Sequence, residues 1–245
     1  MQSKTADITI FVLIIFLLMS GTHSRNKIWN DGKELWSDCV KKSPQKARAY
    51  INLGVTYYEL GELDKAIEWL DKGIKIDPNS SYAYYNLSLV HQKLGNLKKA
   101  IEMAQKSLEL DPTFYMVYYT LGGIYFESSQ FEKAVENYKK FLKNYPYFPE
   151  VHNLMGVAYA SLKIFDKAIE EFEWELKINP YHTMAHLNLG QIYWYEFQNK
   201  DKALKHLKVA LALDPFLPNR REIQKLVHQL ERLPKTEIGS PKELN

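Results

Sequence analysis

The sequence predicts an all-α protein: a right-handed α-solenoid of stacked helix-turn-helix units, preceded by an apolar N-terminal membrane segment. Proline recurs at steps of 34 residues, with a last step of 35, at Pro44, Pro78, Pro112, Pro146, Pro180 and Pro215. Within each period, apolar residues follow the spacing of a helix face. The third observation is an unbroken apolar run near the N-terminus. Self-similarity at a fixed period is typical of repeat architectures.

Each period contains two predicted helices. In residues 50–61, YINLGVTYYELG, the side chains of Tyr50, Leu53 and Tyr57 share one helix face at i, i+3 and i+7. Residues 63–76, LDKAIEWLDKGIKI, show the same amphipathic spacing and predict a second helix. The proline that follows pushes the preceding residue out of the helical region and ends the pair. Neither helix buries its apolar face alone, so neighbouring pairs must stack.

This 34-residue pattern resembles the tetratricopeptide repeat family over residues 47 to 217. The resemblance implies that the first helix of each unit lines a concave surface. Ser88 is a departure, because the other units have glycine at that position. The predicted organisation is an N-terminal anchor or signal segment (1–24), a linker with a capping helix (25–46), five units (47–80, 81–114, 115–148, 149–182 and 183–217), a C-terminal capping helix (218–234) and a disordered tail (235–245).

Composition and motifs favour a binding protein over an enzyme. The formal net charge of +3 is too small to indicate nucleic-acid binding, so no nucleic acid is expected as a partner. Cys39 is the single cysteine, which excludes a multi-cysteine metal site. His182 and His186 are four residues apart, but two ligands do not make a metal site, and packing explains them better. Nucleotide-binding and nucleophile motifs are missing, so we expect no catalytic residues, no metal and no cofactor.

Asparagine recurs at one position of the first helix, at Asn52, Asn86 and Asn188. An amide there can donate to a backbone C=O and accept from a backbone N–H of an extended peptide. The arrangement resembles the asparagine ladder in the tetratricopeptide superhelix of the enzyme that adds N-acetylglucosamine to proteins. The alternative is that Asn-Leu-Gly is common in this repeat and binds nothing.

Other residues predicted on the same concave surface are mainly aromatic. Tyrosine and tryptophan often dominate binding hot spots. The candidates for peptide contact are Tyr85, Tyr119, Tyr82, Trp194 and Arg48. For the aromatic side chains, packing between helices is the competing interpretation.

The apolar run from Ile8 to Gly21 predicts a single-pass N-terminal membrane anchor, with a cleaved signal peptide as the alternative. Residues 24–54 resemble the joint between the last membrane helix and the repeats of polytopic glycosyltransferase-like proteins, including protein O-mannosyltransferase relatives. That resemblance implies an extracytoplasmic array. Basic residues that follow the apolar run, such as Arg25 and Lys27, favour the opposite topology by the positive-inside rule.

The predicted function is a membrane-anchored scaffold that binds an extended protein segment in its concave groove and catalyses nothing. One alternative is a substrate-presenting subunit of a membrane glycosyltransferase system, which would make a glycosyltransferase its partner. Another is a soluble secreted or periplasmic adaptor, if the N-terminus is cleaved.

Overall fold

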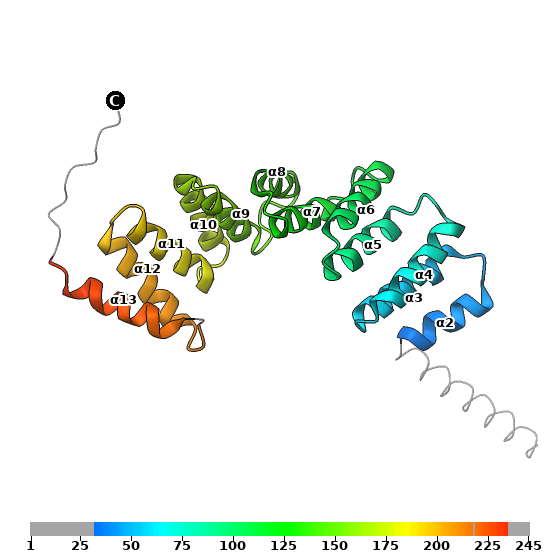
Figure 1. The fold of residues 1–245 in the computed structure, drawn as a ribbon, viewed down its shortest axis with the longest axis horizontal. Helices are drawn as coiled ribbons and strands as arrows, with labels where there is room; N and C mark the ends of the chain where they lie inside the picture. Colours follow the sequence, from blue (N-terminus) through cyan, green and yellow to red (C-terminus); the bar gives the residue numbers. More distant parts are fainter. Residues whose placement is uncertain (1–31, 218, 235–245) are drawn as a thin grey trace, which may run out of the picture. The chain divides into compact units, whose positions relative to one another are not determined.

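The computed structural model describes residues 32–217 and 219–234, and all regular structure within them is helical. Twelve helices occur in these residues: α2 (Gly32–Lys42), α3 (Ala47–Glu59), α4 (Leu63–Ile76), α5 (Ser81–Lys93), α6 (Leu97–Leu110), α7 (Met116–Glu127), α8 (Phe131–Leu142), α9 (Val151–Ser161), α10 (Phe165–Ile178), α11 (Thr183–Tyr195), α12 (Lys200–Leu213) and α13 (Arg220–Arg232). Figure 1 shows them along the chain.

The described residues form two compact units, 32–117 and 118–234, with the boundary just inside α7. In the first unit, α2 packs on α3, α3 pairs with α4, α4 contacts α5, and α5 pairs with α6. In the second, α8 contacts α9, the pairs α9/α10 and α11/α12 contact each other, and α13 packs on α12. The predicted all-α class of stacked helix pairs is therefore confirmed.

A left-handed residue ends the turn between the two helices of each pair. Gly61 and Gly95 hold this position in the first unit, with φ values of +77° and +75°. The turn is closed by backbone bonds such as Glu62 N to Tyr57 O at 2.9 Å, a glycine-type helix end. The corresponding residues of the second unit are not glycine, namely Ser129, Lys163 and Gln198. Their positive φ values carry a strain that glycine avoids.

Four of the turns between successive helix pairs are held by an Asp or Asn side chain that precedes the proline. Its oxygen accepts the backbone N–H of the residue that follows the proline, as in an Asx-turn. The bonds run from Asn79 N to Asp77 Oδ1 (3.1 Å), Thr113 N to Asp111 Oδ1 (2.9 Å), Tyr181 N to Asn179 Oδ1 (3.1 Å) and Phe216 N to Asp214 Oδ1 (2.7 Å). The residue after the proline is thus presented on a fixed turn.

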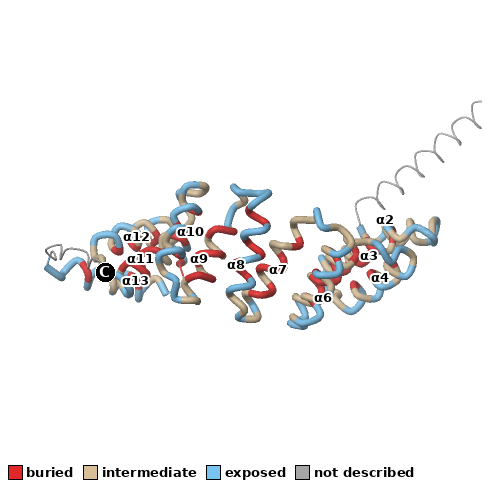
Figure 2. Tube along the Cα trace, turned by 90° about the horizontal axis from the view of Figure 1, so that it is seen from above, coloured by how far each residue is buried: buried red, intermediate tan, exposed pale blue. Residues whose placement is uncertain are grey.

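The core lies between paired helices, where buried positions face each other (Figure 2). A Cβ added to Gly54 of α3 would lie 2.7 Å from Leu70 Cγ and 3.0 Å from its backbone nitrogen. Large buried side chains likewise contact the first-helix glycine in three further pairs: Gly122 with Tyr138, Gly156 with Phe172, and Gly190 with Leu207. Helix pairs therefore approach closely because one partner has no side chain at the crossing.

The predicted membrane-anchored localisation is wrong. No helix in residues 32–217 and 219–234 is long and apolar enough to cross a bilayer. The described helices contain 14 residues at most, as in α4, and span about 21 Å, whereas a bilayer core is about 30 Å thick. The apolar run from Ile8 to Gly21, on which the prediction depended, lies outside the described residues.

Candidate functional site

In the first unit, the two predicted asparagines, Asn52 and Asn86, lie in different hydrogen-bonding surroundings. Asn86 is buried in α5, and its Nδ2 donates to the carbonyl oxygen of Tyr82 at 2.6 Å in the same helix. Asn52 is half-buried on α3, and its backbone carbonyl oxygen, not its side chain, accepts a bond from Thr56 Oγ1 at 2.9 Å. Part of the hydrogen-bonding capacity of Asn86 is therefore used inside its own helix.

Tyr85 and Tyr119 each pack against the turn that follows their helix pair. The ring of Tyr85 lies 4.8 Å from that of Phe114, and the ring of Tyr119 lies 5.7 Å from that of Phe148. Phe114 and Phe148 are 34 residues apart, so the contact recurs from one 34-residue repeat to the next. Both tyrosines are half-buried. This geometry favours packing between successive helix pairs as their main role.

Of the other predicted residues, Tyr82 and Arg48 are exposed, whereas Trp194 is not. Tyr82 is 44% exposed, and its ring lies 6.5 Å from those of Tyr85 and Phe114, so these three rings form an aromatic cluster in the first unit. Arg48 is exposed in the first turn of α3. In the second unit, Trp194 is half-buried near the end of α11.

In the second unit, two asparagine side chains from neighbouring first helices meet. Asn188 Nδ2 of α11 lies 3.4 Å from Asn153 Oδ1 of α9, and both residues are half-buried. Helices α9 and α11 are in contact, although α10 separates them in sequence. The two amides therefore mark a shared face of adjacent first helices, and Asn153 fills this role although it precedes the predicted asparagine position by one residue.

A cleft opens along α11, the helix that carries Asn188. Its volume is about 140 Å³, and its lining combines polar and apolar side chains from α11, α13 and the residue before α13: Leu187, Gln191, Tyr195, Asn219, Glu222, Ile223 and Leu226. We call it the α11–α13 cleft. Gln191 is three residues after Asn188, so it lies on the same helix face. Sequence reasoning missed the α13 side, because this helix was predicted only as a cap.

In the second unit, histidine side chains make hydrogen bonds within the fold. His182 caps α11 by accepting Ala185 N–H at Nδ1, at 3.1 Å. His186 instead faces His206 of α12, with 2.9 Å between their Nδ1 atoms, and its Nε2 is 3.1 Å from Pro180 O. Burial, the neighbouring His186 and nearby lysines lower the pKa of His206 to about 4. Among the described residues, no group of three or more possible metal ligands occurs.

Another histidine, His152, is held by a carboxylate. Its Nδ1 lies 2.7 Å from Glu171 Oε2, and its Nε2 lies 3.2 Å from Pro146 O. Burial lowers the pKa of His152, but the hydrogen bonds to Glu171 and Pro146 outweigh burial, so its pKa is raised overall. Close by, the fully buried Glu175 accepts the backbone N–H groups of Glu150 and Asn153 at 3.1 and 3.3 Å. These carboxylates fix the first turn of α9, which carries Asn153.

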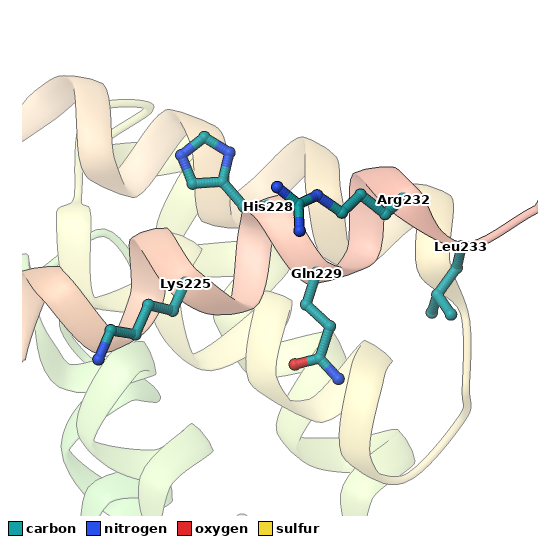
Figure 3. A pocket seen from close by; sticks show the side chains of 5 residues that line it. All are labelled: Lys225, His228, Gln229, Arg232 and Leu233. Atoms are coloured by element: carbon teal, nitrogen blue, oxygen red, sulfur yellow. The ribbon is translucent and has the colours of Figure 1, made fainter.

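A larger depression of about 520 Å³ lies along α13 (Figure 3). Its lining side chains are Lys225, His228, Gln229, Arg232 and Leu233. In Figure 3 they extend from the helix in different directions instead of converging on one point. The α11–α13 cleft is the better candidate site, because one of the helices that line it, α11, also carries the predicted site residue Asn188.

Comparison with protein families identifies the repeat. Residues 56–95 match a TPR repeat model, and three tetratricopeptide repeat models match residues 81–114, 103–136 and 165–218. Together these matches cover more than half of the chain. Among curated proteins, none matches.

Solved structures share the fold. YrrB, described as a TPR protein with an unusual peptide-binding site, is 24% identical with a TM-score of 0.68, over 79% of this chain and 99% of YrrB. MamA of Desulfovibrio magneticus RS-1 is 22% identical with a TM-score of 0.64, over 68% of this chain and 94% of that one. PilF of Pseudomonas aeruginosa is 24% identical with a TM-score of 0.60, over 75% and 88%.

Proposed function

Because the chain belongs to the tetratricopeptide-repeat family, we propose that it is a non-catalytic scaffold that binds an extended segment of a partner protein. The observation that carries this proposal is the contact between Asn153 and Asn188 of α11, a helix that also lines the α11–α13 cleft. Helix α11 thus carries an amide that could bind a peptide backbone and also lines a cleft that could accept a peptide side chain.

The amide pair suits the backbone of an extended peptide. A contact of 3.4 Å uses at most one donor of Asn188 and one acceptor of Asn153. Each amide group offers two donors and two acceptor lone pairs, so both side chains keep the capacity to bond a ligand. Such bonds engage the peptide backbone whatever its sequence.

The α11–α13 cleft could supply the selective contact, because it lies on the same helix as Asn188. Its volume of about 140 Å³ equals that of roughly four to five water molecules in the liquid, enough for one aliphatic side chain. Leu187, Ile223 and Leu226 provide apolar walls, while Gln191 and Glu222 lie at the same cleft. Ligand sites in proteins usually combine apolar walls with a few placed polar groups. We therefore expect a preference for an aliphatic residue at one position of the bound segment.

The first unit offers a further contact region. Arg48, Asn52 and Tyr82 lie on its first helices α3 and α5 and retain exposed surface. Tyr82 combines with Tyr85 in the aromatic cluster. YrrB, which shares the fold, is described as having a peptide-binding site, and this agrees with peptide binding by the present chain. A shared fold alone does not specify function.

Peptides selected from a random library on the full chain would test the proposal. Their affinity should fall at least about tenfold on Asn188→Ala or Gln191→Ala, because each substitution removes groups that contact the peptide or line the cleft. Gln229→Ala is the matched control, since Gln229 lies in the other depression, on α13. Equal affinity of the Gln191 and Gln229 variants would exclude the cleft. The glycosyltransferase alternative depends on the resemblance of residues 24–54 alone, and we do not propose it.

A further inference from the structure

His152 makes two hydrogen bonds that only a charged imidazole ring can make together. Its Nδ1 lies 2.7 Å from the carboxylate oxygen Oε2 of Glu171, and its Nε2 lies 3.2 Å from the backbone oxygen of Pro146. An ionised carboxylate and a backbone carbonyl accept hydrogen bonds but cannot donate them. A neutral imidazole has one N–H donor, whereas the charged ring has two. The two bonds therefore require a proton on both nitrogens of His152.

The equivalent histidine of the next repeat needs no charge. His186 follows His152 by 34 residues, and its Nε2 lies 3.1 Å from the backbone oxygen of Pro180. Its Nδ1, however, lies 2.9 Å from Nδ1 of His206 and not from a carboxylate. Burial, His186 and nearby lysines lower the pKa of His206 to about 4, so this neutral ring can donate to His186. Two neutral rings satisfy this contact, and only the repeat that contains His152 depends on a charge.

Side chains of α10 surround the charged ring of His152. The ring stacks on that of Trp174, with their centroids 5.9 Å apart and 20° between their planes, a contact that favours a cation. Lys177, whose positive charge opposes that of His152, has its Nζ 4.2 Å from the centre of the Trp174 ring. Burial lowers the pKa of His152, but its two hydrogen bonds and the charges of Glu171 and Glu175 outweigh burial, so its pKa is raised overall.

Helices α8 and α11 also pack against α9 and bring titratable groups. On α8, Lys139 lies over the ring of Tyr159, about two turns further along α9. At the start of α11, Nε2 of His182 lies 4.0 Å from Oε1 of Glu175. These groups meet other side chains, so the direct partners of His152 are the two acceptors described above.

His152 lies next to the amide that is proposed to bind the peptide. It is the second residue of α9, and Asn153 is the third. The N–H of Asn153 donates to Glu175 Oε2 at 3.3 Å, and its Oδ1 accepts from Asn188 Nδ2 at 3.4 Å. Loss of a proton leaves the lone pair of one His152 nitrogen facing an acceptor, so one of its two bonds is lost. The first turn of α9 is then held less firmly, and Asn153 with it.

We propose that the charge on His152 regulates peptide binding, so that the second unit binds its peptide more tightly when this ring is protonated. The inference rests on the proposed function, because the switch acts on Asn153 of the amide pair. Histidine suits this role, since its charge changes between about pH 5 and 8. A change of charge that biases a local structure is the usual form of a pH switch.

The raised pKa of His152 gives the direction of the pH effect. A group whose pKa is higher in the folded protein stabilises it fully below the unfolded pKa, about 6.5 for histidine, and loses this stabilisation as the pH rises through the folded pKa. His206 acts in the opposite direction, but only as the pH falls from 6.5 toward about 4. Affinity should therefore be higher near pH 6 than near pH 9.

Fluorescence anisotropy with the full chain and a labelled peptide, selected from a random library at pH 6.0, tests the inference. The peptide contains no titratable side chains and has blocked ends, so that only the protein titrates between pH 6.0 and pH 9.0. Wild-type affinity should be at least about threefold higher at pH 6.0, since a loosened first turn lowers the binding-competent fraction. The ring of His152, followed by NMR, should titrate with the same midpoint as the affinity.

Two variants remove the switch in different ways, and a third is the matched control. His152→Tyr introduces the residue found at the equivalent position of the preceding repeat, Tyr118, and should bind equally at both pH values. Glu171→Gln keeps an acceptor oxygen but removes the charge, so affinity should fall at a lower pH than in the wild type. The control His186→Tyr changes a histidine whose contacts need no charge and should keep the wild-type ratio. Thermal unfolding checks that each variant folds.

The outcomes separate this inference from the proposed function. Equal wild-type affinity at pH 6.0 and pH 9.0, or a wild-type ratio retained in His152→Tyr, would overturn the inference and leave the proposed function intact. Loss of the ratio in His186→Tyr alone would assign the switch to the other histidine and overturn the inference equally. A wild-type chain that binds no selected peptide at either pH would overturn the proposed function, and this inference with it.

Discussion

At each helix crossing, the size of one residue is matched to that of its partner. Glycine faces Leu70, Tyr138, Phe172 and Leu207 in four pairs. In the pair α5/α6 the same positions hold Ser88 and Ala104, and both are fully buried. Serine is tolerated there because the opposing residue is small. The departure of Ser88 from the glycine pattern is therefore a compensated change.

Exchanging these residues should reveal their coupling. Ala104→Leu alone should lower the free energy of unfolding by about 1–3 kcal/mol, because leucine overpacks against Ser88. Adding Ser88→Gly should restore much of the loss, since glycine and leucine then reproduce the pair Gly54 and Leu70. Denaturant unfolding of the two single variants and the double variant measures the coupling. Additive losses would show that these residues do not compensate each other.

His206 should make stability sensitive to acid. Its pKa is lowered from 6.5 to about 4 in the folded protein, so the unfolded chain binds more protons within that window. Stability is complete above pH 6.5 and declines as the pH falls toward 4. In His206→Gln the decline should be smaller by about 1–2 kcal/mol, allowing for solvent screening. Unfolding at pH 7 and pH 4.5 measures it; the control His228→Gln, at an exposed side chain, should decline like the wild type.

Residues whose role follows from their position in the repeat were predicted well. Residues whose role depends on a contact with one particular side chain of another helix were predicted poorly. The small residues at helix crossings follow from periodicity. The contact of His186 with His206 does not, because it depends on which side chain of α12 faces α11. Asn86 matched the asparagine position, but its local bond to Tyr82 is set by the rotamer and not by the pattern.

Helix α9 begins differently from the other first helices. Glu150 precedes it in a left-handed conformation with φ +71°, and its side chain makes no capping bond. Its N-terminal N–H groups are satisfied by the buried Glu175 carboxylate of α10. Unbonded N–H groups at a helix start are costly, so a side chain from the next helix replaces the local cap. The corresponding positions in the first unit are small: Gly73 and Ser107.

Removing this carboxylate should destabilise α9 in particular. Glu175→Ala leaves two backbone donors unbonded and a cavity, which should lower the free energy of unfolding by about 2–4 kcal/mol. Glu175→Gln keeps an acceptor oxygen and should cost less. The control is Glu170→Ala, at an exposed residue of the same helix. Hydrogen exchange should accelerate at Asn153 N–H in the Glu175 variants alone; unchanged protection there would contradict a capping role.

At the level of elements, the sequence predicted helix pairs because period and proline positions agree throughout. It did not predict the left-handed Ser129 and Lys163, since nothing in these residue types indicates positive φ. Nor did it predict that Glu175 would be buried. In residues 169–177, IEEFEWELK, the sequence pattern does not distinguish Glu175 from the other carboxylates, and only the packing of α10 against α9 separates them.

Each end of a stacked array exposes an apolar face that needs a cover, and α13 provides it in the second unit. Ile223, Val227 and Leu230 are buried, while the opposite side of α13 is charged. Leu230→Ala should lower the free energy of unfolding by about 2–5 kcal/mol, because this side chain is fully buried. Leu226→Ala, at a half-buried residue of the same helix, should cost less. Similar losses in thermal unfolding would argue against a capping core centred on Leu230.

For the molecule as a whole, the fold was predicted more fully than the site. Stacked helix pairs follow from periodicity, and the family matches agree with them. The membrane localisation was wrong, because no helix among the described residues is long and apolar enough to cross a bilayer. Asn188 was predicted as a site residue, but the contribution of α13 was missed. The apolar pattern of residues 219–233 predicts a helix and its buried face, but it does not predict that other side chains of that helix line a cleft.

The central claim is that the second unit binds an extended peptide beside Asn153 and Asn188. The most direct test is crosslinking with a photoreactive amino acid at Gln191 or, as a control, at Gln229, in the presence of a library-selected peptide. Crosslinks from position 191 and none from position 229 are the predicted result. Crosslinks from position 229 alone would contradict the claim and place the peptide on the outer side of α13.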